Sequence, residues 1–396
     1  MSNPSPLPSF FGSRKVTIGL YVAAAFFYWL SLYWYVPTLP TYVQSKSDNL
    51  AMVGTVLSMY GLWQALVRLP LGIAADWLGR RKPFILGGLL LAGLGAWLMG
   101  IADGATGLLV GRSITGLAAA AWVPLLVAFS GLFPLEEAVR ATSMLTFVNS
   151  SGRILATGST GVLNNWGGYS LPFFLAAGAA LLGFLVLLPA REIPRARKRP
   201  SVRGITRLVL RQDVLLPALL AALSQYANWG TTFGFNPILA RQFGGSDITQ
   251  SMLVTMHIGV VIVGNLGATA LVNRLGARRL VTAGFVLMAL GVALGGVANG
   301  LWLLFAAQFA IGIAQGISYP VLMGLSIRYV DDSERNTAMG LHQSVYAIGM
   351  FAGPWLSGVL AEAIGIQPMF LLTAAGTLLL GLVGSLRLAG RPDRPA

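Results

Sequence analysis

The sequence predicts an all-α integral membrane protein with twelve transmembrane helices in two pseudo-symmetric six-helix bundles. Of its 396 residues, 55% are hydrophobic and only 10% are charged, whereas a soluble domain carries about 25% charged residues. Apolar runs of roughly 20 residues recur along the chain, each long enough to cross a bilayer as a helix. A short motif returns after 197 residues, with Asn273 in the place of Asp76 and Arg278 in that of Arg81. A repeat at half the chain length indicates two copies of one membrane domain.

Six apolar runs form the predicted N-terminal bundle, residues 16–189. The first run is rich in aromatic residues and is expected to end at Pro37 and Pro40, because proline cannot donate the hydrogen bond that continues a helix. The second ends in the motif around Asp76, and the third follows Pro83 directly. The fourth and sixth are apolar stretches, and the fifth carries several polar residues near its middle. The predicted spans are 16–39, 51–75, 84–102, 106–131, 141–163 and 169–189.

A basic linker, residues 190–213, joins this bundle to the second one, residues 214–388. The linker holds eight Lys or Arg residues among two acidic ones, and Pro194 and Pro200 disfavour a long helix there. Such a segment is expected to lie against anionic membrane lipid. The second bundle repeats the order of the first. Its predicted spans are 214–238, 249–272, 280–299, 301–327, 338–361 and 368–388.

The distribution of charge predicts the orientation in the membrane. A net charge of +14 would suggest a nucleic-acid partner for a soluble protein. Here only Lys46 and Arg241 fall on the predicted outer side and three arginines fall inside spans, which leaves 22 of the 27 Lys and Arg residues on the inner side. Positive charge concentrates in cytoplasmic loops. We therefore expect a multi-pass protein of the cytoplasmic (inner) membrane with both tails, 1–15 and 389–396, in the cytoplasm, and no nucleic-acid partner.

The turn after the second span carries the most specific motif. Residues 69–83 read LPLGIAADWLGRRKP, in which Gly72, Asp76, Gly79, Arg80 and Arg81 resemble motif A of the major facilitator superfamily. The partial second copy consists of Asn273, Gly276 and Arg278. The resemblance implies that Asp76 approaches the N-terminus of the eleventh helix, where the helix dipole favours a negative charge, and latches the two halves together on the cytoplasmic side. Because Asn273 has no charge, the latch should be asymmetric.

A second motif lies in the fourth span. Arg112 followed by Gly116 resembles motif B of the same family, and Gln308 takes the place of Arg112 in the second half. The fifth span, at Gly152–Gly161, lacks the proline that the family's drug–proton antiporters often carry there. The resemblance nevertheless covers nearly the whole chain and is nearest to the bacterial drug or metabolite efflux branch. It implies a transporter and leaves the substrate open.

Three arginines, Arg68, Arg112 and Arg153, fall within predicted spans, where a charged side chain is costly and therefore a candidate for function. None of the 13 acidic residues lies in the middle of a span. Two interpretations stay open. The arginines are neutralised by helix carbonyls, by the Asn149 amide, by hydroxyls and by water, and act in structure and gating; or one or two of them bind an anionic group of the substrate, because arginine suits carboxylate and phosphate.

Two histidines, His257 and His342, are also placed within spans. A single histidine in a helix bundle is commonly a packing residue with its hydrogen bonds satisfied. Histidine also titrates near neutral pH, so either residue is a candidate proton carrier in place of the absent carboxylate. The chain has no cysteine and no recognisable metal or phosphate motif, so we expect neither metal nor cofactor.

By resemblance, the first, fourth, seventh and tenth helices line a cavity between the two halves. Polar and aromatic residues on these helices, together with Asn149 of the fifth, are therefore the candidate substrate contacts. They are Tyr28, Trp29, Trp122, Asn149, Gln225, Asn228, Trp229, Gln308, Gln315 and Tyr319. A lining of rings and amides suits an amphiphilic organic molecule.

The expected function is secondary active transport of a small amphiphilic organic solute by alternating access, as efflux coupled to protons. Uptake or exchange of an organic anion is the alternative, motivated by the three arginines. A membrane enzyme or receptor that transports nothing is disfavoured, because the repeat spans the chain and no catalytic constellation occurs. We expect a monomer whose partners are its substrate, protons and membrane lipid.

Overall fold

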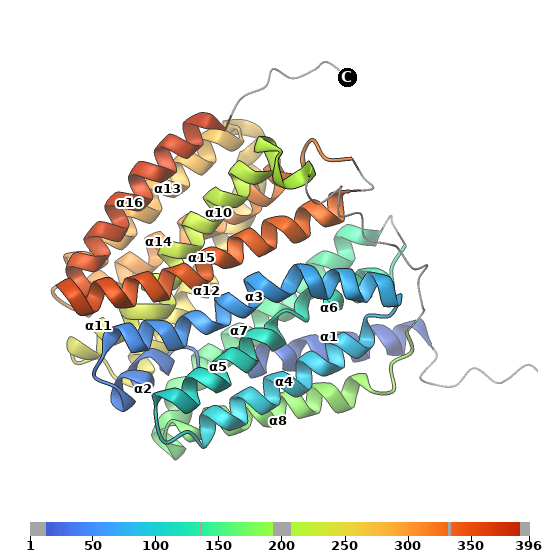
Figure 1. Ribbon diagram of the computed structural model, residues 1–396, viewed down its shortest axis with the longest axis horizontal. Coiled ribbons are helices and arrows are strands. Elements are labelled where there is room, and N and C mark those ends of the chain that lie inside the picture. Colours follow the sequence, from blue (N-terminus) through green and yellow to red (C-terminus); the bar gives the residue numbers. More distant parts are fainter. Residues whose placement is uncertain (1–12, 135–136, 193–206, 332–333, 389–396) are drawn as a thin grey trace, which may run out of the picture.

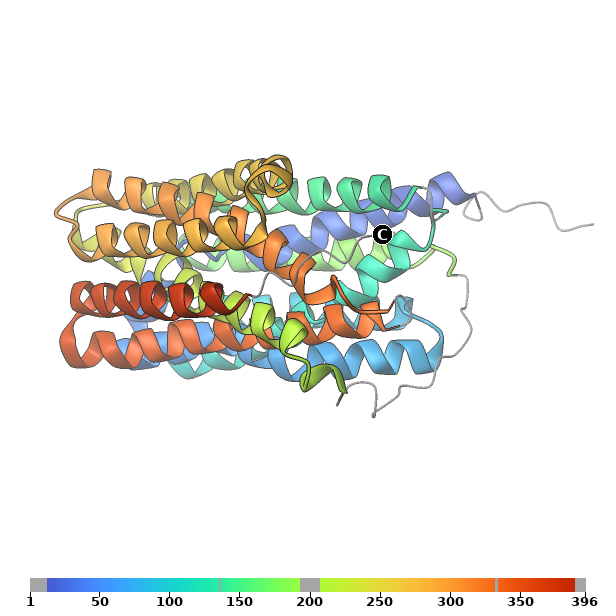
Figure 2. The ribbon, with the colours of Figure 1, turned by 90° about the horizontal axis from the view of Figure 1, so that it is seen from above.

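The computed structural model describes residues 13–134, 137–192, 207–331 and 334–388. Most of the predicted linker and nearly all of both predicted tails lie outside the described residues. Within them the chain is built of helices, without a β-strand. The helices run roughly alongside one another (Figures 1 and 2), as apolar segments must when their backbone groups can be satisfied only internally.

Within the described residues the N-terminal half supplies eight helices, because its first and fourth predicted spans are each divided between two helices. They are α1 (Arg14–Tyr33), α2 (Leu39–Lys46), α3 (Leu50–Leu78), α4 (Lys82–Gly100), α5 (Ala105–Ala119), α6 (Trp122–Ser130), α7 (Ala138–Gly167) and α8 (Ser170–Leu187). The C-terminal half supplies α10 (Gln212–Gly230), the π-helix η3 (Thr231–Phe235), α11 (Asn236–Gln242), α12 (Asp247–Leu275), α13 (Ala277–Gly296), α14 (Leu301–Ile327), α15 (Arg335–Ile364) and α16 (Ile366–Arg387).

Ten segments of the described chain, with α5 and α6 counted as one, are long and apolar enough to cross a membrane. The more polar α7, and α10 with its continuation through η3 and α11, complete the predicted twelve. The predicted fold class is thereby confirmed.

The two halves repeat each other almost residue by residue. Adding 197 to the bounds of α3 gives the bounds of α12, and adding it to those of α7 gives those of α15. Four of the five glycines with positive φ among the described residues repeat in the same way: Gly79 (71°) corresponds to Gly276 (82°), and Gly168 (70°) to Gly365 (90°). Residues with a Cβ rarely adopt this conformation. The repeat seen in one sequence motif therefore extends through both bundles.

The first span differs from the single helix predicted over 16–39. Helix α1 ends at Tyr33, a turn follows, and Pro40 lies in the first turn of α2, where its missing N–H would have had no partner. Pro40 therefore begins a helix instead of ending one. At the same offset of 197, Pro237 begins α11 directly after the π-helix η3, so both first spans of the two bundles are broken at equivalent places.

The fourth span is also interrupted, since α5 ends at Ala119 and α6 begins at Trp122. Pro124 lies at the start of α6 and cannot donate a hydrogen bond to the carbonyl of Ala120, four residues earlier. The predicted span over 106–131 is therefore two shorter helices.

The halves meet along two pairs of helices, α3 with α15 and α7 with α12. In Figure 1, α3 and α15 lie side by side along the boundary, with α4, α5 and α8 on one side and α10, α13 and α16 on the other. At Gly54 an added Cβ would lie 2.8 Å from the Cα of Gly358. Small residues permit such close backbone approach in membrane helices.

Candidate functional site

Four buried aromatic side chains meet at the boundary between the halves. Tyr33 and Tyr60 come from α1 and α3, and Trp229 and Phe233 come from α10 and η3. The ring centroids of Tyr60 and Trp229 lie 5.3 Å apart, those of Trp229 and Phe233 4.7 Å, and those of Phe233 and Tyr33 6.5 Å. We call Tyr33, Tyr60, Trp229 and Phe233 the central aromatic cluster, which joins the two halves through ring contacts.

Arg153 of α7 lies beside this cluster. The carbon of its guanidinium is 4.4 Å from the ring centroid of Tyr33 and 5.8 Å from that of Trp29. Trp29 in turn contacts the ring of Trp122 at 4.9 Å, so two predicted site residues do meet. The buried Nε of Arg153 has no hydrogen-bond partner.

Arg112 of α5 lies on another side of the cluster and is 2% exposed. Its guanidinium carbon is 4.2 Å from the ring centroid of Tyr60 and 5.9 Å from that of Tyr35. Two of its nitrogens, Nε and Nη1, are buried without a hydrogen-bond partner. Gly116 allows this approach, since a Cβ there would lie 2.8 Å from the carbonyl oxygen of Met59 and 3.0 Å from the Cα of Tyr60.

Arg68 of α3 is 7% exposed and donates a hydrogen bond to Gln64 on the same helix. Its guanidinium carbon is 5.6 Å from the ring centroid of Tyr346, and that ring is 5.8 Å from the ring of Tyr319. Arg68 and Arg112 are buried and Arg153 is half-buried. Each of the three therefore lies against an aromatic ring, and two of them lie against rings of the central aromatic cluster.

None of these three arginines has a carboxylate partner within the part of the chain that the structure describes. The ion pairs found there join Arg14 to Glu137, Arg81 to Asp76, Arg207 to Glu334, Arg211 to Asp213, and Arg241 to Asp247. Ring faces attract cations, but a ring does not cancel a charge. The region between the halves therefore contains both positive charge and aromatic rings.

Several other predicted site residues tie helices to one another. The hydroxyl of Tyr28 donates to the carbonyl of Ala118 at 3.0 Å. Gln308 accepts from Thr232 at 3.0 Å, and Gln315 accepts from Ser224 at 2.8 Å. Gln225 and Asn228 are buried on α10, and the side-chain oxygens of Asn228 and Asn149 have no hydrogen-bond partner.

The two histidines have different surroundings. His257 of α12 lies edge-on to Phe233, with ring centroids 5.8 Å apart, so it borders the central aromatic cluster. Its Nδ1 is buried without a hydrogen-bond partner. His342 of α15 makes a hydrogen bond of 2.7 Å through Nδ1 to the hydroxyl of Ser326 on α14, and its Nε2 is buried without a hydrogen-bond partner.

Sequence reasoning did not identify Tyr60, Phe233 or Tyr346 as site residues. Each was one of many aromatic residues in an apolar span. They contact Arg112, Tyr33 and Arg68 respectively, and all three contacts join different helices. No periodicity within one helix could reveal them.

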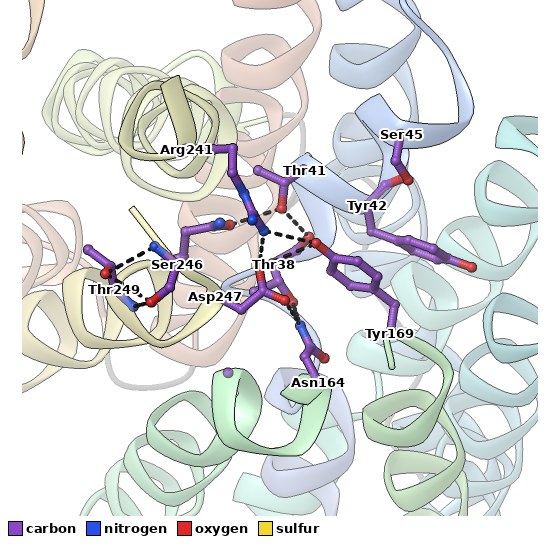
Figure 3. Close-up of polar contacts among 12 residues, drawn as sticks. Thr38, Thr41, Tyr42, Ser45, Asn164, Tyr169, Arg241, Ser246, Asp247 and Thr249 are labelled. Atoms are coloured by element: carbon purple, nitrogen blue, oxygen red, sulfur yellow. Dashed lines mark hydrogen bonds and ion pairs between the residues drawn. The ribbon is translucent and has the colours of Figure 1, made fainter. Parts of the chain in front are cut away.

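One end of the boundary between the halves is closed by a polar network centred on Asp247 (Figure 3). Asp247, in the first turn of α12, forms an ion pair with Arg241. Its other carboxylate oxygen accepts from the amide of Asn164 at 2.9 Å, and its Oδ1 accepts from the hydroxyl of Tyr169 at 3.3 Å. Asn164 also donates to Thr38 at 3.0 Å. We call Thr38, Asn164, Tyr169, Arg241 and Asp247 the Asp247 network.

Asp247 lies in surroundings that favour a carboxylate. A helix N-terminus favours negative charge, and only 11% of the Asp247 side chain is exposed. Burial, with the nearby Asp247 charge, raises the pKa of Tyr169 above its ordinary value. Tyr169 therefore stays protonated at neutral pH and can donate to Asp247 across the boundary.

Next to the Asp247 network, α7 and α12 touch through their backbones. The N–H of Gly161 donates to the hydroxyl of Ser251 at 2.8 Å, and the hydroxyls of Thr255 and Thr157 are 2.9 Å apart. A Cβ added to Gly161 would lie 2.5 Å from the backbone of Asp247. On the other pair of helices, Glu362 of α15 accepts from the N–H of Leu50 at 2.6 Å. This end of the boundary is therefore tightly packed.

Ion-pair and hydrogen-bond contacts hold the motif A turn in place. Gly79 ends α3 in the left-handed conformation, and Arg81 binds Asp76 at 2.5 Å. Glu192, which sequence reasoning missed, accepts hydrogen bonds from the N–H groups of Arg81 and Lys82 at the start of α4. A glutamate directly after an apolar span in a basic segment was the available signal.

The predicted contact of Asp76 with the start of α15 stays a prediction, because the ion pair seen here is with Arg81 on the same turn. A Cβ on Gly72 would meet open space, so packing does not require a glycine there. Arg80 is exposed, as are Asn273, Gly276 and Arg278 of the second copy.

A pocket of about 310 Å³ lies elsewhere, within the C-terminal half. Its lining comes from α12, α13, α14 and Arg328 and is largely apolar. No residue of the central aromatic cluster contributes to it, so it is separate from the candidate substrate site.

The family model described as Major Facilitator Superfamily matches residues 21–227 and again 218–396. The chain belongs to this superfamily. Multidrug resistance protein 1 of Bacillus subtilis is 23% identical to it, over 93% of this chain and 95% of that protein. The two ranges matched by the family model correspond approximately to the two halves of the fold. Membership of the superfamily confirms the prediction of a membrane transporter and not an enzyme.

Solved structures show the same fold. The nucleoside transporter NupG has a TM-score of 0.76 at 18% identity, covering 95% of this chain and 99% of that one. A bacterial homologue of the human lysosomal transporter Spinster, in an inward-facing and occupied conformation, has a TM-score of 0.78 at 16% identity, covering 95% and 96%.

Proposed function

We propose that this superfamily member exports a small amphiphilic organic solute by alternating access. The observation that carries the proposal is the position of the central aromatic cluster. It lies between the two halves, with Arg153 and Arg112 against its rings, and the boundary is packed shut at the end formed by the Asp247 network. A site between two halves whose access alternates is the arrangement that secondary transporters use.

The direction and substrate class are supported by two lines of reasoning. Multidrug resistance protein 1, similar over nearly its whole length, favours efflux of organic compounds. Aromatic rings with a few polar groups bind amphiphilic molecules, and Trp29, Trp122 and Trp229 supply such rings here. Closure at the Asp247 end fits an inward-facing state, as in the Spinster homologue.

Coupling to protons is part of the proposal. His257 is the better-placed carrier, because it borders the central aromatic cluster beside Phe233, whereas His342 is bonded to Ser326. An imidazole in contact with the substrate region would exchange its proton as the site alternates. Efflux against proton entry would make the protein an antiporter.

Proteoliposomes with an acidic interior test the proposed function. We use three probes with one phenyl ring and one chain length: 4-phenylbutanoate, 4-phenylbutanamide and 4-phenylbutylamine. At least one probe should enter these proteoliposomes faster than it enters protein-free liposomes. Dissipating the pH gradient should slow the entry of that probe. If none of the three crosses faster than in protein-free liposomes, the proposed function is wrong.

The orientation gives a separate prediction. We place the protein in the cytoplasmic membrane with the Asp247 end outside. The chain has no cysteine, so single cysteines report accessibility without background. Asp48→Cys and Gln242→Cys, both at exposed positions near that end, should react with a membrane-impermeant maleimide on intact cells. Arg279→Cys, at the start of α13, should react only after permeabilisation. The reverse labelling pattern would contradict the orientation.

A further inference from the structure

Resting on the proposed function, we propose that the substrate is an amphiphilic organic anion whose acidic group binds between Arg153 and Arg68. Its apolar part would lie against the central aromatic cluster. The two arginines come from α7 and α3 of the N-terminal half. Arg153 lies against Tyr33 of the central aromatic cluster, and Arg68 lies on the helix that carries Tyr60. The chemistry that fits is a carboxylate or phosphate attached to an apolar, ring-containing body.

Arg153 and Arg68 carry charges that no acidic side chain of the described residues balances. Withdrawing a cation from water without a partner carries a large desolvation penalty, and an intramembrane charge is normally paired. Arg153 and Arg68 have no carboxylate within the described residues. Each also has a buried Nε without a hydrogen-bond partner. An anionic ligand would supply both the charge and the acceptors.

The ring contacts of Arg68 and Arg153 also favour an anionic ligand. Arg68 and Arg153 are held against the rings of Tyr346 and Tyr33 at 5.6 and 4.4 Å. A guanidinium stacked on a ring keeps its in-plane N–H groups available, and these match the two oxygens of a carboxylate or phosphate. Arg112 differs in that its guanidinium lies near two rings, those of Tyr60 and Tyr35, and it is the least exposed of the three arginines.

The charges near the central aromatic cluster disfavour a cationic ligand. Among the described residues a cationic drug would meet three arginines and no carboxylate paired with them, and like charges in a water-poor region repel strongly. The rings alone would favour a cation, but arginine side chains already lie against Tyr33, Tyr60 and Tyr346. The charge and the ring contacts therefore both favour an anion.

Binding of the three phenylbutyl probes to the full-length protein tests the inference. In nanodiscs of neutral lipid, 4-phenylbutanoate should bind more tightly than the amide and the amine. Arg153→Gln and Arg68→Gln should each weaken binding of the anion by roughly 10- to 150-fold, the range for losing a hydrogen bond to a charged group. Arg153→Lys should recover part of the loss, because the charge stays while the paired geometry is lost.

Arg279→Gln is the matched control, since it removes one arginine charge at an exposed position at the start of α13 and should leave all three affinities unchanged. Melting temperatures are recorded for each variant. Equal losses for all three probes that follow the melting temperature would overturn the inference and show a structural role. Tighter binding of the amide or amine by the unmodified protein would overturn it without any variant.

Two further outcomes separate this inference from others. Anionic lipid offers the same chemistry, so the titration is repeated with phosphatidylglycerol in the nanodiscs. Loss of 4-phenylbutanoate binding there would overturn the substrate assignment in favour of a lipid headgroup. Flux of the amide or amine without flux of the anion would overturn the inference and leave the proposed function standing, whereas flux of none overturns the function itself.

Discussion

Replacing Gly161 by alanine should reduce transport at least severalfold while the protein still folds. The new Cβ would lie 2.5 Å from the backbone of Asp247, so α7 and α12 must separate where the boundary is packed shut. Overpacking of this kind costs about 1–3 kcal/mol, which shifts an equilibrium between closed and open states by roughly 5- to 150-fold. The cost applies only to the state in which α7 and α12 are packed together at this end. The transport rate should therefore fall more than the stability of the folded protein.

Gly158→Ala is the matched control, one turn away on the same helix. A Cβ there would lie 3.8 Å from Thr255, an ordinary contact, so transport should stay near normal. Thr157→Cys, at a buried position facing Thr255, reports opening. External maleimide should label it faster in the Gly161→Ala protein than in the Gly158→Ala protein. Equal labelling and equal transport would show that this contact does not gate the site.

Asp76→Asn is expected to reduce transport by up to about 30-fold, which corresponds to the ~2 kcal/mol upper value for a charge at a helix N-terminus. The proposed latch requires Asp76 to leave Arg81 and approach the start of α15 when the cytoplasmic side closes. Stability should change little, because 47% of the Asp76 side chain is exposed and exposed ion pairs contribute about 0–1 kcal/mol.

Initial rates in proteoliposomes, with expression and melting temperature measured in parallel, test the latch. Asp48→Asn removes an exposed carboxylate at the opposite end of α3 and should leave the rates unchanged. Asp76→Asn rates equal to those of the unmodified protein would refute the latch. A large fall in melting temperature would instead make Asp76 a structural residue of the turn.

The sequence alone determined the membrane bundle and its internal repeat. Helix length, apolar composition and turn residues are local properties, and they act before any helix packs on another. The repeat was visible in one motif, and the structure carries it to the positive φ of Gly79 and Gly276 and to the matching bounds of α3 and α12. The three arginines were also identified from the sequence, since a charge inside an apolar run is conspicuous.

Only the tertiary structure decided what surrounds those arginines and where the boundary closes. Tyr60 and Arg112 lie on different helices, as do Asn164 and Asp247, and their distances depend on how α3, α5, α7 and α12 pack. Prolines marked the broken spans, yet Pro40 begins a helix where an end was expected, because proline is equally suited to a first turn. Contacts between helices that are far apart in sequence depend on packing, and local pattern does not encode them.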